Sequence, residues 1–181
     1  TIIMTLKWLI IDEAIILKSK LNLLINKMKE KKYDAFLVPR GDVFSGEEVP
    51  KNEERLKYIS NFSGSAGFAI ISSVSKLKSA IFSDGRYKIQ LKKEINSKKF
   101  NIFEGGTKEA YYFLKINHKN LNIIAIDPWL ITCTQYEYLR KTLSKTKLQI
   151  NFIDENLIDK IWINRPNQVE EKIFKLSYKQ T

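Results

Sequence analysis

The sequence predicts an α/β fold in which a mixed β-sheet is flanked by helices. Short apolar runs alternate along the chain with longer segments whose apolar residues recur every three or four positions, and polar turn residues separate the two kinds. The 181 residues, of which 44% are apolar, are enough to bury one ordinary core. We therefore expect one α/β domain with a short tail.

The first predicted elements are a helix and a strand. Asp12 is placed to cap a long amphipathic helix, because apolar residues follow it at three- and four-residue steps until the pattern ends near Lys31. Residues 35–38 form a short apolar run that stops at Pro39. This pattern predicts a buried strand followed by a loop.

The next segments predict a short helix and a β-hairpin. Residues 53–59 are long enough for one or two helical turns. Two short apolar runs, 68–72 and 79–82, are joined by a polar segment. They are expected to form the two strands of a hairpin.

The middle of the chain predicts a helix, a strand and a second helix. Asp84 can cap a helix over residues 84–95, where apolar residues recur among lysines. A strand is expected at 100–103, and a turn of two glycines precedes a helix at 108–116.

The last third continues the alternation. A strand is expected at 122–126, and either Thr132 or Thr134 can cap the helix that follows. Thr134 and Glu137 have the spacing of a capping box. The final expected elements are a strand at 148–153 and a helix at 156–162.

The charge balance bears on the choice of partner. The chain carries 31 Lys and Arg against 20 Asp and Glu, which gives a net charge of +11. Such an excess is typical of proteins that bind nucleic acid or anionic surfaces. Nearly all of it is lysine, however, whereas bidentate recognition of phosphates and bases uses arginine. We interpret the excess as a compositional bias and expect no specific nucleic-acid partner.

Residues 1–11 are expected to be an extension that precedes the domain. Charged residues such as Lys7, Asp12 and Glu13 interrupt the apolar start before it reaches the roughly 20 apolar residues of a membrane span. We therefore expect no membrane association. The one cysteine, Cys133, excludes an internal disulfide, and a reduced, cytoplasmic setting fits best.

Most sequence templates for catalysis fail. The one histidine, His118, lies in a polar turn, so no His-based metal pair can form. Cys133 has no histidine nearby in sequence, and we expect it to pack on the buried face of a helix. The GSAG segment lacks the Lys-Ser/Thr pair of a P-loop. We expect a tight, closely packed turn there, in which Gly64 and Gly67 supply the required backbone angles.

Five motifs together are similar to one enzyme family. They are PRGDVFSGEEVP at 39–50, FSGSAG at 62–67, SDGRY at 83–87, AIDPWLIT at 125–132 and NLIDKIWINRP at 156–166. In this order they resemble the amino-terminal domain of the Xaa-Pro aminopeptidases, metallopeptidases that remove the first residue when the second is proline. The resemblance covers about residues 21–181. It implies a creatinase/prolidase amino-terminal-domain-like fold.

The resemblance also implies where the chemistry lies. The family's catalytic domain holds a dinuclear metal centre, usually manganese, ligated by two aspartates, a histidine and two glutamates. None of those ligand motifs can be placed on this sequence. We therefore expect no catalytic residue in this chain, no metal or cofactor bound by it, and no peptidase activity from it alone.

The acidic loop is the first candidate site. The resemblance implies that Asp42 and Glu47 lie toward the cleft between the domains, near the catalytic centre. On the residues alone, a loop with several carboxylates could hold a cation or an amino terminus, but a solvated charged loop is the plainer interpretation. The family's usual histidine and tyrosine are replaced here by Phe44 and Glu48, so the contacts of these two side chains are expected to differ.

Three more residues are predicted to support the substrate cleft, namely Arg55, Asp84 and Arg86. For Asp84 and Arg86 the alternative is a local bridge that fixes the turn between strand and helix, and this alternative is the plainer one. For Arg55 a structural role is likewise the plainer alternative. The aromatic residues expected in the core rather than on a ligand platform are Phe62, Tyr87 and Trp129.

The expected domain boundaries follow from these assignments. Residues 1–11 are an extension, residues 12–163 the creatinase-like N-terminal domain, and residues 164–181 a linker with the start of a truncated second domain. Pro166 marks the last boundary because it interrupts a helical pattern.

Three functional hypotheses remain open. The first is the non-catalytic N-terminal domain of a metal-dependent Xaa-Pro aminopeptidase, recorded as a fragment, whose partners are a catalytic domain, in cis or in trans, and peptide substrates. The second is a free-standing binding or oligomerisation module descended from such an enzyme, which pairs with a separately encoded catalytic chain or binds peptides itself. A homo-oligomer is a further partner that we consider. The third is a basic domain that binds anions and loses affinity steeply with salt.

Overall fold

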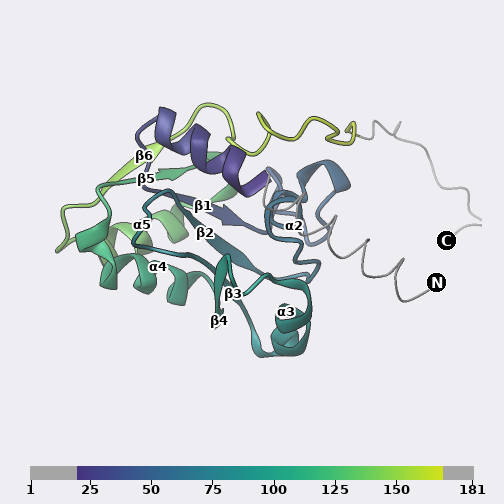
Figure 1. Cartoon of the computed structure of the whole chain (residues 1–181), viewed down its shortest axis with the longest axis horizontal. Helices are drawn as coiled ribbons and strands as arrows, with labels where there is room; N and C mark the ends of the chain where they lie inside the picture. Colours follow the sequence, from purple (N-terminus) through teal and green to yellow (C-terminus); the bar gives the residue numbers. More distant parts are fainter. Residues whose placement is uncertain (1–19, 169–181) are drawn as a thin grey trace, which may run out of the picture.

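The structure is a computed structural model that describes residues 20–168. Its centre is a six-stranded sheet with the strand order β4-β3-β2-β1-β5-β6 (Figure 1). The strands are β1 Ala35–Pro39, β2 Phe68–Ser72, β3 Ser79–Ser83, β4 Phe100–Glu104, β5 Ile123–Ile126 and β6 Gln149–Phe152. The predicted α/β class with a mixed sheet is confirmed.

Strand β2 differs in direction from the other described strands. It pairs antiparallel with both β1 and β3, and the β2–β3 pair is the predicted hairpin. The pairs β1–β5, β5–β6 and β3–β4 are all parallel. Every described strand except β2 therefore runs in the same direction, and their carboxyl ends share one edge of the sheet.

Helices cover both faces of this sheet (Figure 1). Residues 20–30 are helical, as predicted, while the predicted cap at Asp12 lies outside the described residues. The other described α-helices are α2 Arg55–Ser60, α3 Lys88–Glu94, α4 Thr107–Ile116 and α5 Cys133–Leu143. Short 3₁₀ helices are η1 Lys51–Glu53, η2 Gly85–Tyr87, η3 His118–Asn120 and η4 Pro128–Leu130.

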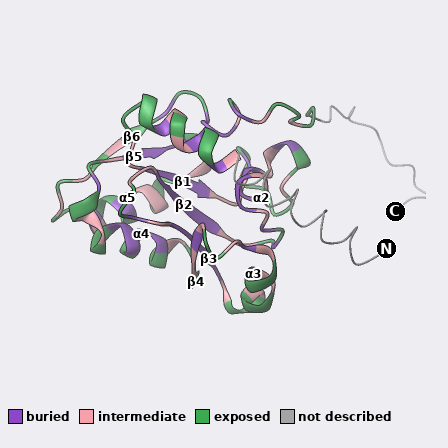
Figure 2. Cartoon of the chain, viewed as in Figure 1, coloured by how far each residue is buried: buried purple, intermediate pink, exposed green. Residues whose placement is uncertain are grey.

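Two apolar cores lie on opposite faces of the sheet. Side chains alternate along a strand, so Phe36 and Val38 of β1 enter one core while Ala35 and Leu37 enter the other. The first core is closed by the helix at residues 20–30 together with α2 and α3, and the second by α4 and α5. Figure 2 shows the central strands buried between helices whose outer faces are exposed.

The prediction of a helix at 156–162 is wrong. This segment forms turns instead. The side-chain carbonyl of Asn156 accepts a hydrogen bond from the Ile158 amide, and the Tyr58 hydroxyl donates to the Ile161 carbonyl at 2.9 Å. Because one local side chain and one distant side chain take up these backbone groups, the helical preference of the segment is overridden.

The start of α5 selects between the two predicted caps. The Thr132 hydroxyl accepts a hydrogen bond from the Gln135 amide at 3.2 Å, and the Gln135 side chain accepts one from the Thr132 amide at 2.9 Å. Thr132 is thus the N-cap. Cys133 stands in the first turn and is exposed, so the prediction of a packed thiol is wrong. The buried stripe of α5 runs through Leu139 and Leu143 instead.

Candidate functional site at the carboxyl edge of the sheet

The strand directions bring most of the singled-out motifs to one edge. The loops that follow the parallel strands lie at the carboxyl ends of those strands, and the loop that precedes antiparallel β2 lies at the same edge. Ligands of open α/β sheets bind outside the carboxyl ends of the strands. We call this region the carboxyl edge, formed by residues 40–50, 63–67, 84–86, 127–129 and 154–156.

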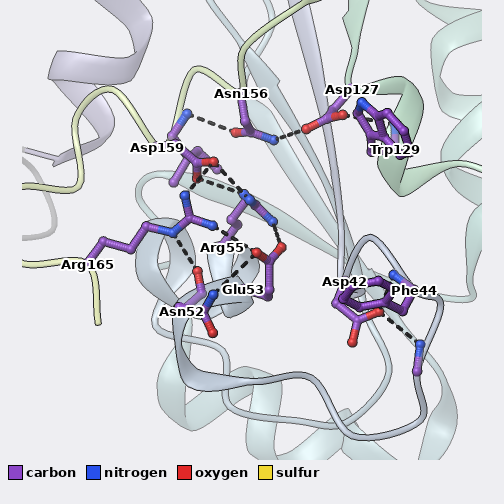
Figure 3. A network of polar contacts seen from close by, with 12 residues as sticks. Asp42, Phe44, Asn52, Glu53, Arg55, Asp127, Trp129, Asn156, Asp159 and Arg165 are labelled. Carbon is purple, nitrogen blue, oxygen red and sulfur yellow. Dashed lines mark hydrogen bonds and ion pairs between the residues drawn. The ribbon is translucent and has the colours of Figure 1, made fainter. Parts of the chain in front are cut away.

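Asp42 organises the loop after β1. It is only 5% exposed, and its Oδ1 accepts hydrogen bonds from the amides of Phe44 and Gly46, both at 2.9 Å. A Cβ at position 46 would stand 3.0 Å from the second Asp42 oxygen, which accounts for the glycine. One oxygen of the Asp42 carboxylate is therefore committed to the loop backbone (Figure 3).

The tip of this loop presents its side chains to solvent. Glu47 and Glu48 are both exposed, and Phe44 is 79% exposed. An exposed carboxylate such as that of Glu47 is free to pair with a cationic group. The loop thus combines a buried carboxylate that sets its shape with outward-facing carboxylates and one outward-facing aromatic ring.

Asp84 and Arg86 pair with each other. The guanidinium donates from Nε to Oδ1 at 2.9 Å and from Nη2 to Oδ2 at 2.8 Å, and the Arg86 amide donates to Oδ1 at 3.0 Å. The hydrogen bonds and charge of Arg86 hold the pKa of Asp84 below its ordinary value. The pair closes the turn between β3 and η2, in the geometry of the local bridge considered above. Asp84 also lines a hollow of about 120 Å³ with Lys88 and Glu104.

The GSAG turn packs closely, but for a different reason from the one predicted. Among the described glycines, Gly105 has a positive φ, whereas Gly64 and Gly67 do not, so the prediction about their backbone angles is wrong. A Cβ on Gly64 would stand 2.3 Å from Phe62 Cζ and 2.8 Å from Tyr87 Cδ1. Gly64 is needed for space between the chain and two aromatic rings, and Gly67 for space beside Phe62 and Leu56.

Trp129 lies outside the core. Phe62 is buried and Tyr87 packs against the core as predicted, whereas Trp129 is 69% exposed, so the prediction for Trp129 is wrong. Asp127 Oδ1 accepts the Trp129 amide at 3.0 Å, and Asp127 Oδ2 accepts from the Asn156 side chain at 2.7 Å (Figure 3). This arrangement caps η4 and leaves the indole ring on the surface.

Arg55 is buried in an ion-pair network rather than open to a cleft. Arg55 is 4% exposed, and its Nε and Nη2 donate hydrogen bonds to the two carboxylate oxygens of Asp159, each at 2.8 Å. It also forms an ion pair with Glu53. Burial acts to lower its pKa, but the bonds to Asp159 and Glu53 outweigh burial and raise it. Arg165 contacts the same two carboxylates at 2.9 and 2.8 Å.

The predicted site residues therefore have separate partners. Asp42 bonds to its own loop, Asp84 bonds to Arg86, and Arg55 bonds to Asp159 and Glu53, while Glu47 points to solvent. Sequence reasoning missed the network partners Glu53, Asp159 and Arg165, and the Asp127–Asn156 bond. Asp127, Asn156 and Arg165 all belong to motifs that carried the family resemblance, which is the signal that could have found them.

A metal centre does not fit the described part of the chain. Within residues 20–168, no three His, Cys, Asp or Glu side chains gather so that they could hold a metal ion. The buried carboxylates of Asp42 and Asp127 bond to amide groups instead. Over the same residues, no helix has the length and apolar character needed to cross a bilayer.

This fold and edge define a recognised class of domain. The model of the Creatinase/Prolidase N-terminal domain family matches residues 20–158, and the chain belongs to this family. A Paracoccidioides lutzii protein named "Probable Xaa-Pro aminopeptidase P" is 32% identical over 165 residues, covering 89% of this chain and 26% of that protein. A protein of the same name from Laccaria bicolor is 33% identical over 156 residues, covering 84% and 24%. The chain thus spans about a quarter of these curated relatives.

Solved structures show the same fold. X-prolyl aminopeptidase from Caenorhabditis elegans, described as a cytosolic enzyme with a di-nuclear active site, superimposes with a TM-score of 0.73 at 24% identity, covering 83% of this chain and 26% of that one. The N-terminal domain of the cytoplasmic peptidase PepQ from Mycobacterium tuberculosis gives a TM-score of 0.63 at 14% identity, covering 79% and 98%. The predicted family and fold are both confirmed.

Proposed function

We propose that this chain is the non-catalytic N-terminal domain of a metal-dependent Xaa-Pro aminopeptidase. The observation that supports this most strongly is the match of residues 20–158 to the family domain, together with relatives of that name whose length the chain spans only in part. The peptidase reaction would then be performed by a catalytic domain beyond this domain. Two adjacent metal ions, manganese in this proposal, would activate water and polarise the scissile carbonyl there.

The role of this chain would be to help position the substrate. Its carboxyl edge would face the catalytic domain, and the loop at 40–50 would lie beside the amino end of the peptide. Asp42 would keep the loop in shape, while the exposed carboxylate of Glu47 would pair with the substrate ammonium. Arg55, Asp84 and Arg86 would support this edge through their ion pairs. The setting would be cytoplasmic.

Glu47→Gln tests the substrate-positioning role. In the natural polypeptide that contains this sequence, we expect kcat/KM for an Xaa-Pro peptide to fall about tenfold, because a charge-assisted hydrogen bond is lost. Glu48→Gln removes a neighbouring exposed carboxylate and serves as the matched control. An unchanged kcat/KM for Glu47→Gln would remove this side chain from the site.

The 181-residue chain alone is expected to be inactive. An assay with manganese and an Xaa-Pro peptide should give no turnover above background. Robust turnover by a pure sample would contradict the assignment of catalysis to another domain.

An alternative is a free-standing binding or oligomerisation module. The sheet and the two cores within residues 20–168 favour it, because they bury apolar side chains on both faces of the sheet. A stable polypeptide of 181 residues in the source cells would support this alternative, and rapid degradation of that species would exclude it.

A further inference from the structure

The segment at 153–168 is held in place by tertiary contacts together with a few local turns. It contains neither a helix nor a strand. Its buried apolar side chains are Ile153, Leu157, Ile158 and Ile161. Trp162 stacks on Tyr58 of α2 at 4.5 Å between ring centroids, and the Tyr58 hydroxyl donates to the Ile161 carbonyl. An irregular segment fixed in this way has a defined path only as long as these contacts persist.

Four charged side chains extend these contacts to the last described residues. We call Glu53, Arg55, Asp159 and Arg165 the clamp (Figure 3). Arg165 donates to the Asn52 carbonyl at 2.7 Å and to Glu53 Oε1 at 2.9 Å, and it pairs with Asp159 Oδ2 at 2.8 Å. Each carboxylate of the clamp therefore contacts both arginines.

The clamp is balanced and shielded from water. Two guanidinium groups face two carboxylates, and the side-chain exposures are 5% for Arg55, 12% for Glu53, 25% for Asp159 and 28% for Arg165. Partly buried pairs are screened by salt much less than surface pairs. The planar fork of arginine also imposes direction on each contact, which a lysine would not do.

The location of the clamp connects two functional points. Glu53 and Arg55 follow directly on the loop at 40–50, which carries Asp42 and Glu47. Arg165 lies three residues before the last described residue, Gln168. The clamp thus connects Glu53 and Arg55, which follow the candidate substrate loop at 40–50, to Arg165, which lies near the end of the described chain.

We propose that the clamp fixes the direction in which the polypeptide leaves this domain relative to the loop at 40–50, and so sets the orientation of the part that follows. This inference rests on the proposed function, since orientation matters only if a catalytic domain follows. The four clamp side chains are positioning residues, because they act through the chain path rather than on the substrate.

A distance measurement tests the clamp in the 181-residue chain itself. Cys133 is the one cysteine and is exposed, so spin labels on Cys133 and on Gln168→Cys report how firmly residue 168 is held relative to α5. Pulsed electron paramagnetic resonance should give a narrow distance distribution with the clamp intact. Arg165→Ala should broaden it at least about twofold, because the chain end then loses its ties.

A matched control removes a lysine from the same segment. Lys160 pairs with Glu155 on the surface, outside the clamp, so Lys160→Ala should leave the distribution narrow. Arg165→Lys keeps the positive charge, so its distance distribution should be narrower than that of Arg165→Ala but broader than that of the wild type. Arg165 is chosen because it is the most exposed clamp member, and a thermal melt of the variant verifies that the domain is folded. A distribution as narrow in folded Arg165→Ala as in the wild type would overturn the proposal.

Kinetics of the longer natural polypeptide provide the second test. If Arg165→Ala misdirects the catalytic domain, KM for an Xaa-Pro peptide should rise and kcat/KM should fall by about tenfold or more. The reason is that small displacements of a positioning group are costly to catalysis. A merely destabilising change would reduce the active fraction and leave KM unchanged. Wild-type kinetics in Arg165→Ala would overturn the orienting role. If the wild-type polypeptide shows no Xaa-Pro activity, the proposed function fails, while the distance measurement still decides whether the clamp holds the chain.

Discussion

The backbone at Gly64 lies against the edges of two aromatic rings. Phe62 and Tyr87 meet edge to face there with centroids 5.7 Å apart, and a Cβ on residue 64 would enter the space of both rings. Gly64→Ala should therefore lower the free energy of unfolding by about 1–3 kcal/mol, the usual cost of overpacking. Urea denaturation measures this difference.

Gly41→Ala is the control for this substitution. A Cβ at position 41 would meet nothing within 4 Å, and the backbone there has no positive φ. We expect a change within about 0.5 kcal/mol for this variant. Equal losses at the two positions would show that backbone freedom, rather than space between the rings, explains Gly64.

Glu94 should contribute to the pH dependence of stability. It accepts hydrogen bonds from the Ser63 amide at 2.8 Å and the Ser63 hydroxyl at 2.7 Å. Burial acts to raise its pKa, but the bonds from Ser63 and Gln90 outweigh burial and lower the pKa below the ordinary 4.5. A carboxyl with a depressed folded-state pKa stabilises the fold fully above its ordinary pKa, and this contribution is lost as the pH falls through the folded-state pKa.

Glu94→Gln measures that contribution. Between about pH 7 and about pH 3, the wild type should lose more unfolding free energy than Glu94→Gln, because only the wild type has this carboxylate to protonate. Urea midpoints at the two pH values give the comparison. Parallel losses in the two proteins would mean that Glu94 does not contribute to acid sensitivity.

Residue roles were predictable from sequence where the partners are local. Asp84 and Arg86 stand two positions apart, and their bridge was among the alternatives considered. Trp129 and Cys133 were misjudged because exposure depends on which face of an element packs against the core, and in α5 that face carries Leu139 and Leu143. The Arg55–Asp159 pair spans 104 positions, so no local pattern reveals it.

At the scale of elements, the N-terminus of α5 provides a sharp test. Thr132 forms the capping box, whereas Thr134 lies inside the helix. Thr132→Ala should cost about 1 kcal/mol of unfolding free energy, because a backbone donor loses its acceptor. Thr134→Ala should be near neutral or slightly stabilising, since alanine is the better helix former. A larger loss for Thr134→Ala, seen in urea denaturation, would reassign the cap.

Strands and helices with a clear internal pattern matched their predictions closely. The apolar runs at 35–38 and 68–72 became β1 and β2, because residues buried on both faces of a sheet read as continuous apolar runs. The segment at 156–162 has apolar residues but became turns, because Asn156 and the groups around Tyr58 bind its backbone. The helical preference of a segment is overridden where side chains, whether local or distant, compete for its backbone groups.

At the scale of the molecule, strand direction gathers the motifs. Because every described strand except β2 runs the same way, loops that are distant in sequence reach the carboxyl edge together. Sequence patterns identified the loops and the mixed sheet, but strand order depends on packing between distant elements. The gathering of the Asp42, Asp84 and Asp127 loops at one edge was therefore visible only in the structure.

The intact mass of the native polypeptide in its source cells tests the central claim most directly. An N-terminal domain of a Xaa-Pro aminopeptidase should occur in a species about three and a half times as long as this chain, since the 165 matched residues cover 26% of its relative. Mass spectrometry of protein captured with an antibody to residues 20–168 gives the answer. A species much heavier than 21.2 kDa that contains this sequence is the predicted result. A stable species of 21.2 kDa alone would contradict the account.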